Sequence, residues 1–424
     1  MKIRYRIRLY SAVQVCLLTF LTTAAPATSI FSLNTTGETI QPVEGRSRGM
    51  GGLGVALFDN NTGLANPGVL GWADRMSFSI TYLPEYQEPR DESGDNRIGF
   101  SIFPHMGGVM PLPGGLVAGA ELGLIRGFGF FSEAERSSPD VGGYISKLTK
   151  DGGAYRFSLG LGRSFRQSFS VGLMYDWLLG NAREHWSWDY ADQALSDVST
   201  RLQTEHSGTG LRLGTGVKLG RYDVGLYFKP GMTMTMKHRL YLQGEETLES
   251  STNYVKLHST QLRYPWLTGF GVTHRPDSSL TLGMEVIYSP TSNIEENGAR
   301  SDLFSDHLRI GLGIEYRHSR RRISPLLSQI AWRTGYYQQS WETKVMGQTM
   351  GERFLTLGLG IPTALIEGSL DLSLEYGRRS ADLPVGQNRL TRTSETIWRF
   401  SISLKGQERW RKRRRPWDED EIDW

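Results

Sequence analysis

Residues 75–82 read Arg75-Met76-Ser77-Phe78-Ser79-Ile80-Thr81-Tyr82. Apolar side chains occupy one parity of this stretch, and small or polar side chains occupy the other. Because successive side chains of a strand point to opposite faces, the alternation predicts a β-strand with one apolar face. The same period of two recurs along nearly the whole chain. A closed sheet, with lipid outside and water or a plug inside, accommodates so many strands of this kind.

The bulk composition agrees with a membrane barrel built from strands. The chain has 424 residues, 38% of them hydrophobic, and a mean hydropathy of -0.36. No stretch of the expected mature chain supplies the ~20 apolar residues that a spanning helix needs, but a spanning strand turns only alternate residues toward lipid. The 50 glycines fall inside strand-like segments, where they leave room in a lumen.

Both ends of the chain differ from the part between them. Four basic residues, an apolar run and Ala25-Pro26-Ala27 predict a signal peptide over residues 1–27. The only cysteine, Cys16, lies within it, so cysteine chemistry is excluded from the expected mature chain. Residues 409–424 form a charged tail, which we expect to be solvated in the periplasm, with recruitment of an anionic partner as the alternative.

The alternation predicts an all-β transmembrane antiparallel barrel of about 14 strands over residues 75–408, preceded by an N-terminal segment, residues 28–74. Each strand is near the ~10 residues that cross a tilted barrel wall. The expected strands are 75–82, 96–103, 115–126, 154–164, 168–180, 208–219, 222–230, 262–274, 279–290, 306–317, 329–340, 352–362, 368–379 and 394–405.

The lengths of the connections alternate as well. Tight turns at 166–167, 220–221 and 276–278 contrast with long connections over 127–153, 181–207, 231–261 and 291–305, which we expect to be loops. Outer-membrane barrels pair short periplasmic turns with long outer loops. The sequence therefore predicts the outer membrane of a Gram-negative-type bacterium, with membrane lipids around the barrel.

The N-terminal segment carries the most motif-like residues of the chain. Residues 46–52 read Arg46-Ser47-Arg48-Gly49-Met50-Gly51-Gly52, followed by Asp59-Asn60 and then Asn66-Pro67. This order resembles the outer-membrane long-chain fatty acid transporter superfamily (FadL-like), including PorV/PorQ-type outer-membrane proteins. Gly68 stands where members carry alanine. The resemblance is strong at these residues and weak over the rest of the mature chain.

The resemblance implies a 14-stranded barrel whose N-terminal segment folds inside as a hatch or plug. The implied hatch residues are Arg46, Gly49, Met50, Gly51, Gly52, Asp59, Asn66 and Pro67. In that family, hydrophobic substrates enter from the outer loops and leave sideways through a defect in the third strand. The sequence does not decide whether the plug only closes the barrel or also moves. It likewise leaves undecided whether the glycines of the third strand permit a kink or merely clear space.

Inward parity places charged side chains of both signs in the lumen. Interleaved arginines and carboxylates pair with each other, whereas a diffusive porin favours rings of one sign. We therefore predict a plugged lumen without general ion conductance. The predicted polar network comprises Arg156, Arg212, Glu285, Arg309, Glu315, Arg333, Asp371, Glu375 and Arg399.

No motif in the chain favours an enzyme or a cofactor. The eight histidines show no metal-ligand spacing. Trp186, Trp188 and Tyr190 form an aromatic cluster in an expected outer loop, which would capture a hydrophobic ligand or simply stiffen the loop. A nucleic-acid partner is not expected.

Two functions follow from these observations. The first is passive uptake of hydrophobic small molecules through a plugged lumen. The second is a PorV/PorQ-like scaffold that binds partners in protein secretion or envelope assembly. The sequence leaves this choice open, because the resemblance covers both branches.

Overall fold

The computed structural model describes residues 29, 31, 36–59, 62, 64–91, 94–95, 98–166, 168–192, 194–244, 254–319, 324–363, 368–385 and 389–408. The predicted signal peptide and the charged tail lie outside these residues. No helix among them is long and apolar enough to cross a membrane.

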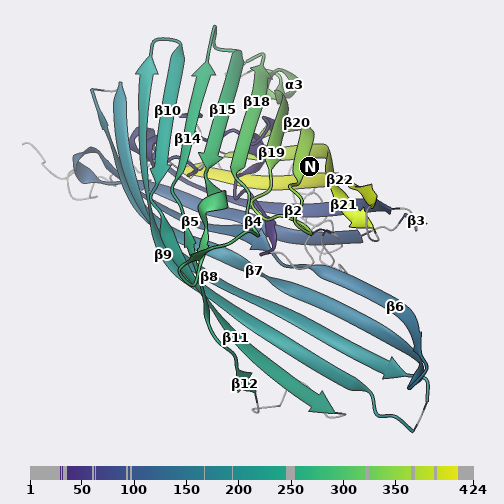
Figure 1. The fold of residues 1–424 in the computed structure, drawn as a ribbon. Coiled ribbons are helices and arrows are strands. Elements are labelled where there is room, and N and C mark those ends of the chain that lie inside the picture. Colours follow the sequence, from purple (N-terminus) through teal and green to yellow (C-terminus); the bar gives the residue numbers. More distant parts are fainter. Residues whose placement is uncertain are drawn as a thin grey trace, which may run out of the picture.

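Fourteen antiparallel strands close into a barrel (Figure 1). Neighbouring strands in the chain pair with one another, and the ring closes where the first strand pairs with the last, from Met76↔Glu408 to Arg90↔Ser394. The wall strands are β2 (Met76–Asp91), β4 (Ile98–Pro111), β5 (Leu116–Gly127), β7 (Gly142–Phe165), β8 (Phe169–Tyr190), β9 (Val198–Leu219), β10 (Tyr222–Lys229), β14 (Leu267–His274), β15 (Leu280–Ser289), β18 (His307–Arg317), β19 (Ala331–Ser340), β20 (Gly351–Thr363), β21 (Gly368–Val385) and β22 (Arg389–Glu408).

Strand β18 shows why these residues form a barrel wall. Its side chains alternate strictly between buried and exposed. The exposed set is apolar, and Leu308, Ile310 and Leu312 are each 42–46% exposed, whereas the inward-facing Arg309 and Glu315 are buried. The outer surface thus forms the apolar band of a membrane barrel, which confirms the prediction from parity.

Several strands are much longer than expected. β7, β8 and β9 have 24, 22 and 22 residues, and Figure 1 shows them leaving the barrel as a long projecting sheet. The expected loops over 127–153, 181–207 and 231–261 are therefore wrong over most of their described length. Above the membrane neither face contacts lipid, so the apolar alternation fades while the hydrogen-bond ladder continues.

Shorter elements complete the fold. The projecting sheet also contains β6 (Phe130–Ser138), β11 (Met232–Gly244), β12 (Val255–Lys256) and β13 (Thr260–Tyr264). The N-terminal segment contributes β1 (Glu38–Thr39), α2 (Gly45–Gly49) and the 3₁₀-helix η2 (Pro67–Trp72). The remaining elements are β3 (Gly94–Asp95), β16 (Glu295–Glu296), β17 (Ala299–Arg300), η3 (Pro113–Gly115), η4 (Thr291–Asn293) and α3 (Leu326–Gln329).

Candidate functional site

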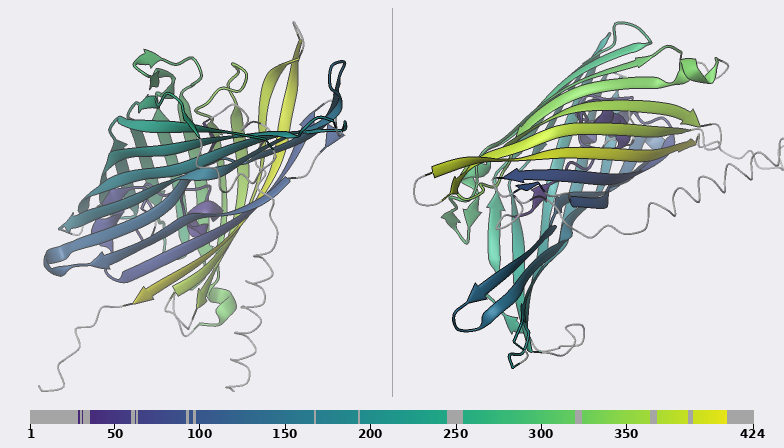
Figure 2. Two further views of the ribbon diagram at one scale, coloured as in Figure 1. Left: turned by 90° about the horizontal axis from the view of Figure 1, so that it is seen from below. Right: turned by 90° about the vertical axis from the view of Figure 1, so that its right-hand side faces the viewer.

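The N-terminal segment, defined here as residues 36–73 where the structure describes them, lies within the ring of strands (Figure 2). Helix α2 packs against β19–β22, and η2 packs against β7, β8 and β9. The segment therefore reaches opposite sides of the wall. The bore is filled along this length by side chains and backbone of the same chain.

Wall glycines allow the segment to approach the wall closely. A Cβ atom on Gly313 or Gly335 would collide with the backbone of Met50 and Gly51. Gly51 and Gly52 themselves have φ angles of 67° and 70°, a left-handed conformation that favours glycine. Met50 is fully buried and packs with Leu53 and Leu57. Gly49 lies nearby, where its carbonyl accepts a hydrogen bond from Thr356.

Arg46 joins the segment to the wall through carboxylates. Its Nε and Nη2 atoms donate to Glu315 at 2.9 and 3.0 Å, and its Nη1 donates to Asp59 at 3.0 Å. Arg333 donates to the same Glu315 at 2.7 Å and to Asp371 at 2.6 Å. These five residues form one charge-assisted network at the short-turn end of the bore.

A second network holds the glycine-rich turn that follows α2. Arg309 donates to the carbonyl of Gly51 at 2.6 Å and to Glu285 at 3.2 Å. The other oxygen of Glu285 accepts from the backbone N–H groups of Gly54 and Val55 at 2.7 and 2.8 Å. A wall arginine and a wall carboxylate thus satisfy the carbonyl and N–H groups of a buried turn.

Asn66 and Pro67 begin η2. The Asn66 side chain accepts from Gly68 N–H at 2.8 Å and donates to the carbonyls of Val55 and Thr215 at 2.8 and 3.0 Å. Pro67 occupies the first position of the 3₁₀-helix, where its missing N–H is tolerated. One amide therefore caps the helix and links two parts of the segment to the wall.

Arg212 organises the wall beneath η2. It donates to Asp176 at 3.0 Å, to Glu121 at 2.9 Å and to the Leu64 carbonyl of the segment at 2.7 Å. Arg156 also donates to Glu121, at 3.1 Å. The predicted lumen residues consequently fall into separate clusters, each of which includes or contacts the N-terminal segment.

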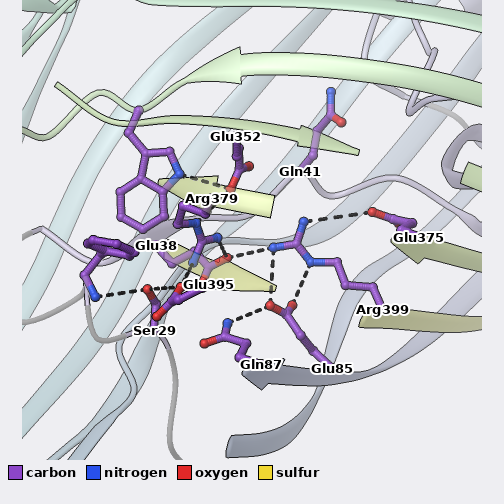
Figure 3. A network of polar contacts seen from close by, with 12 residues as sticks. Ser29, Glu38, Gln41, Glu85, Gln87, Glu352, Glu375, Arg379, Glu395 and Arg399 are labelled. Atoms are coloured by element: carbon purple, nitrogen blue, oxygen red, sulfur yellow. Dashed lines mark hydrogen bonds and ion pairs between the residues drawn. The ribbon is translucent and has the colours of Figure 1, made fainter. Parts of the chain in front are cut away.

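The largest buried charge cluster lies at the long-strand end of the bore (Figure 3). Glu38 accepts hydrogen bonds from Arg379 and from Arg399, the latter at 2.8 Å. Arg399 also donates to Glu85 at 2.7 Å, and Arg379 to Glu395 at 3.1 Å. Additional contacts come from Glu352, Glu375, Tyr337, Trp341, Arg48 and Ser29.

Sequence reasoning found Arg399 and Glu375 in this cluster and missed most of the rest. Arg379 and Glu395 have the same inward parity as Glu375 and Arg399, which is the signal that identifies them. Glu38 carries no such signal, because it lies in a two-residue strand outside the barrel repeat.

The wall divides between β4 and β5. Their pairing runs from Pro111↔Val117 only as far as His105↔Gly123. Beyond this point β5 pairs instead with β1, as Glu38↔Gly127 and Thr39↔Arg126. The Pro42 ring packs where a Cβ of Gly123 would be. Residues 38–42 of the segment thus occupy the place where the two wall strands part.

Two cavities flank this part of the segment. The outer cavity, about 250 Å³, is lined by the projecting sheet and by Phe128, Leu262 and Phe304, among others. The inner cavity, about 160 Å³, is lined by Ile40, Ile125 and Ile287, together with polar groups that include Lys229. An apolar cluster of Leu178, Met232, Met234, Leu262, Ile294 and Phe304 lies beside both, with Ile125 packed against it.

Trp186, Trp188 and Tyr190 lie in strand β8, so the expectation of an aromatic loop is corrected here. The two indoles stack with centroids 6.2 Å apart, and Tyr190 contacts Tyr144 on the neighbouring strand. They are half-buried on a projecting sheet. The hydrogen-bonded pairing of β7 with β8 continues as far as Tyr144↔Tyr190, which the sequence pattern did not indicate.

Among the described residues, no group of three or more His, Cys, Asp or Glu side chains could hold a metal ion. The polar clusters are built mainly from arginine–carboxylate pairs. Their chemistry is that of structural anchoring.

The sequence matches the BamG family over residues 7–416. The chain belongs to the BamG family. No curated protein matches the sequence. The family match includes the wall strands and the N-terminal segment, so the two parts occur together within it.

Solved structures share the barrel of this BamG-family protein at low sequence identity. A FadL homologue from Pseudomonas aeruginosa has a TM-score of 0.60 at 14% identity, over 88% of this chain and 99% of that one. The CymD monoaromatic hydrocarbon channel has 0.56 at 15%, over 87% and 98%. The Pseudomonas putida toluene transporter TodX has 0.57 at 13%, over 88% and 100%.

This likeness concerns the fold, which is that of FadL-type outer-membrane barrels. It confirms the FadL-like resemblance that residues 46–67 indicated. None of the three structures is described as an enzyme. The finer assignment to a PorV/PorQ branch stays a prediction.

Proposed function

We propose that this protein lets small hydrophobic molecules pass passively through the outer membrane, with the N-terminal segment as the plug. Molecules enter the outer cavity beneath the projecting sheet. They pass along the apolar cluster to the inner cavity and leave sideways between β4 and β5. The observation that carries the proposal is the parting of these strands at His105↔Gly123, where residues 38–42 of the segment lie against β5.

The sizes of the cavities support a small cargo. Volumes of about 250 and 160 Å³ suit single-ring or short-chain molecules better than large solutes. Each lining combines apolar side chains with about as many polar or charged ones, such as Lys150 and Glu184 in the outer cavity and Arg156 and Arg309 in the inner one. Two structures that share the fold are described as a monoaromatic hydrocarbon channel and a toluene transporter, which favours the same class of cargo here.

The proposal is tested by locking the segment to the wall. The hydrophobic dye N-phenyl-1-naphthylamine is excluded by an intact outer membrane and fluoresces once inside an apolar phase. Cells that produce the protein should take up the dye faster than cells without it. In a Cys16→Ser background, Glu38→Cys with Gly127→Cys, which face each other in the β1–β5 ladder, should form a disulfide that stops this uptake, and a reductant should restore it.

The matched controls are the two single-cysteine variants, which keep the segment free. Uptake that is unchanged by the closed disulfide would contradict lateral exit. Uptake that is no faster than in cells without the protein would contradict transport altogether.

A second candidate, a partner-binding barrel in protein secretion or envelope assembly, is favoured by one observation. β7, β8 and β9 are each more than twice the ~10 residues that cross a membrane, and together they build a sheet beyond the barrel. Such a sheet offers a surface for a protein. Removal of residues 183–201, which include the described outer ends of β8 and β9, should abolish co-purification of a stable partner while leaving dye uptake measurable.

A further inference from the structure

Arg126 lies on the third wall strand and points into the bore because of a β-bulge. In the β5–β7 ladder Leu124 pairs with Tyr155 and Arg126 with Ala154, so Ile125 is the extra residue. A bulge exchanges the faces of the residues that follow it. Arg126 is accordingly 6% exposed, although simple alternation from the inward-facing Glu121 would turn it toward lipid.

The Arg126 guanidinium reaches across the lumen. It forms an ion pair with Glu342, which follows β19, a strand on the far side of the ring from β5. The same guanidinium donates to Tyr264 at 3.4 Å. It also donates to two threonines of the N-terminal segment, Thr36 at 3.3 Å and Thr39 at 3.4 Å. Arg126 therefore connects two sides of the wall with the segment between them.

The partners of Arg126 divide between the two cavities. Thr36 lines the outer cavity, as does Thr343, which is adjacent to Glu342 in the chain. Thr39 and Glu342 line the inner cavity. The ion pair thus lies where the outer cavity ends and the inner one begins.

We propose that the Arg126–Glu342 ion pair is the gate between the two cavities. The inference rests on the proposed function, because it assigns a gate to the same passage. An apolar molecule cannot take the place of either charged partner, so it passes only when the pair separates. Separation leaves two largely buried charges, 7% and 12% exposed, without each other, which keeps the gate closed for most of the time.

Thiol modification tests the gate without any transported molecule. In a Cys16→Ser background, Leu267→Cys places a thiol in the lining of the inner cavity and Leu202→Cys one in the lining of the outer cavity. Protein in lipid nanodiscs is treated with methyl methanethiosulfonate, and the reaction is followed by intact mass. Leu202→Cys should react readily and Leu267→Cys slowly.

Opening the gate should change only the inner thiol. Arg126→Ala should speed modification of Leu267→Cys at least about tenfold, equivalent to about 1.4 kcal/mol, and leave Leu202→Cys unchanged. Exchanging the charges, with Arg126→Glu and Glu342→Arg together, should restore the slow rate. Arg263→Ala, which removes an exposed partner of Glu295, is the matched control and should have no effect.

If Arg126→Ala fails to fold, Glu342→Gln, which keeps nearly the same side-chain size, removes the ion pair instead and should speed modification of Leu267→Cys in the same way. Equal rates at Leu267→Cys with and without the ion pair would overturn the gate, as would a charge exchange that leaves the fast rate. These rates do not depend on a cargo. Absence of dye uptake in the parent protein would therefore contradict the proposed function, and it would leave the thiol-modification rates, which test the gate, unaffected.

Discussion

Glu38 and Arg379 are hydrogen-bonded although 341 residues separate them in the chain. Glu38 belongs to the strand that fills the parted wall, and Arg379 belongs to β21 on the other side of the opening. Their contact holds residues 38–42 in the opening from the side opposite to β5. Tyr376 and Trp398 meet on the outer surface with ring centroids 4.4 Å apart, and Arg379 lies three residues beyond Tyr376 along β21, toward the long-strand end of the bore.

Seating of the N-terminal segment should weaken as the pH rises through neutrality. Burial raises the pKa of Glu38 from 4.5 to about 7; Glu85 and Glu352 raise it too, while Arg379 and Arg399 oppose the rise. Glu375, Glu395, Arg48 and Tyr337 complete the charged and titratable surroundings. A raised acid pKa means that the seated state binds the proton more tightly, so its stabilisation is full below pH 4.5 and is lost as the pH passes 7.

Hydrogen–deuterium exchange of the peptide covering residues 36–42 measures this effect. After correction for the intrinsic rate, protection should fall between about pH 4.5 and about pH 7 and level off above that. Glu38→Gln, which resembles the protonated form, should remove the dependence. Protection that rises with pH in the parent protein would contradict this assignment.

Arg212→Met should destabilise the barrel by about 3–5 kcal/mol, because it leaves the buried carboxylates of Asp176 and Glu121 without their common partner. Arg263→Met is the control, since Arg263 pairs with Glu295 at 3.6 Å on an exposed surface, and it should cost less than about 1 kcal/mol. Urea unfolding in detergent micelles measures both. Equal effects of the two variants would show that the buried cluster is not an anchor.

Gly313→Ala should destabilise the protein by about 1–3 kcal/mol, because the added methyl group collides with the Met50 backbone. At Gly143 the nearest atom to an added Cβ lies 4.0 Å away, so Gly143→Ala should change stability by less than about 0.5 kcal/mol. The same unfolding experiment compares them. A tolerated Gly313→Ala would mean that the segment is not held closely against β18.

The filled bore should conduct no steady ionic current. The N-terminal segment occupies the lumen, and its charged neighbours are paired with one another. Single-channel recordings in planar bilayers should show no large and lasting open state, with an open porin as the positive control. A large, steady conductance would contradict a plugged lumen.

Trp186→Ala and Trp188→Ala should each slow dye uptake about two- to fivefold, if the stacked indoles contribute about 0.5–1 kcal/mol to capture of the dye. His185→Ala, the neighbouring change on the opposite face of β8, is the control. Both kinds of variant should keep the heat-induced shift of a folded barrel in gel electrophoresis. Unchanged uptake in the tryptophan variants would leave the indoles with a structural role only.

The barrel itself could be predicted from the sequence because lipid and lumen impose opposite demands on alternate residues. Strand β18 follows that rule over its full length. β8 follows it up to the membrane surface and then continues for about ten more residues without it. Where both faces of a strand meet a polar environment, alternation no longer marks the strand.

The candidate site was predictable only in part, for a related reason. Arg212, Arg309 and Arg333 lie at inward positions of regular strands, so parity finds them. Arg126 follows a bulge, which reverses the parity of its strand. Glu38 finds its partners only once the segment has folded back into the bore, and no local pattern encodes that contact.

Arg399 has a further consequence for assembly. It pairs with Glu85 across the junction of the first and last wall strands, and with Glu38 of the N-terminal segment. The same guanidinium therefore stabilises both the closure of the strand ring and the seating of the N-terminal segment in the bore. We therefore expect a barrel without the seated segment to be less stable than the whole protein, and ring closure and insertion of the segment to occur together during biogenesis.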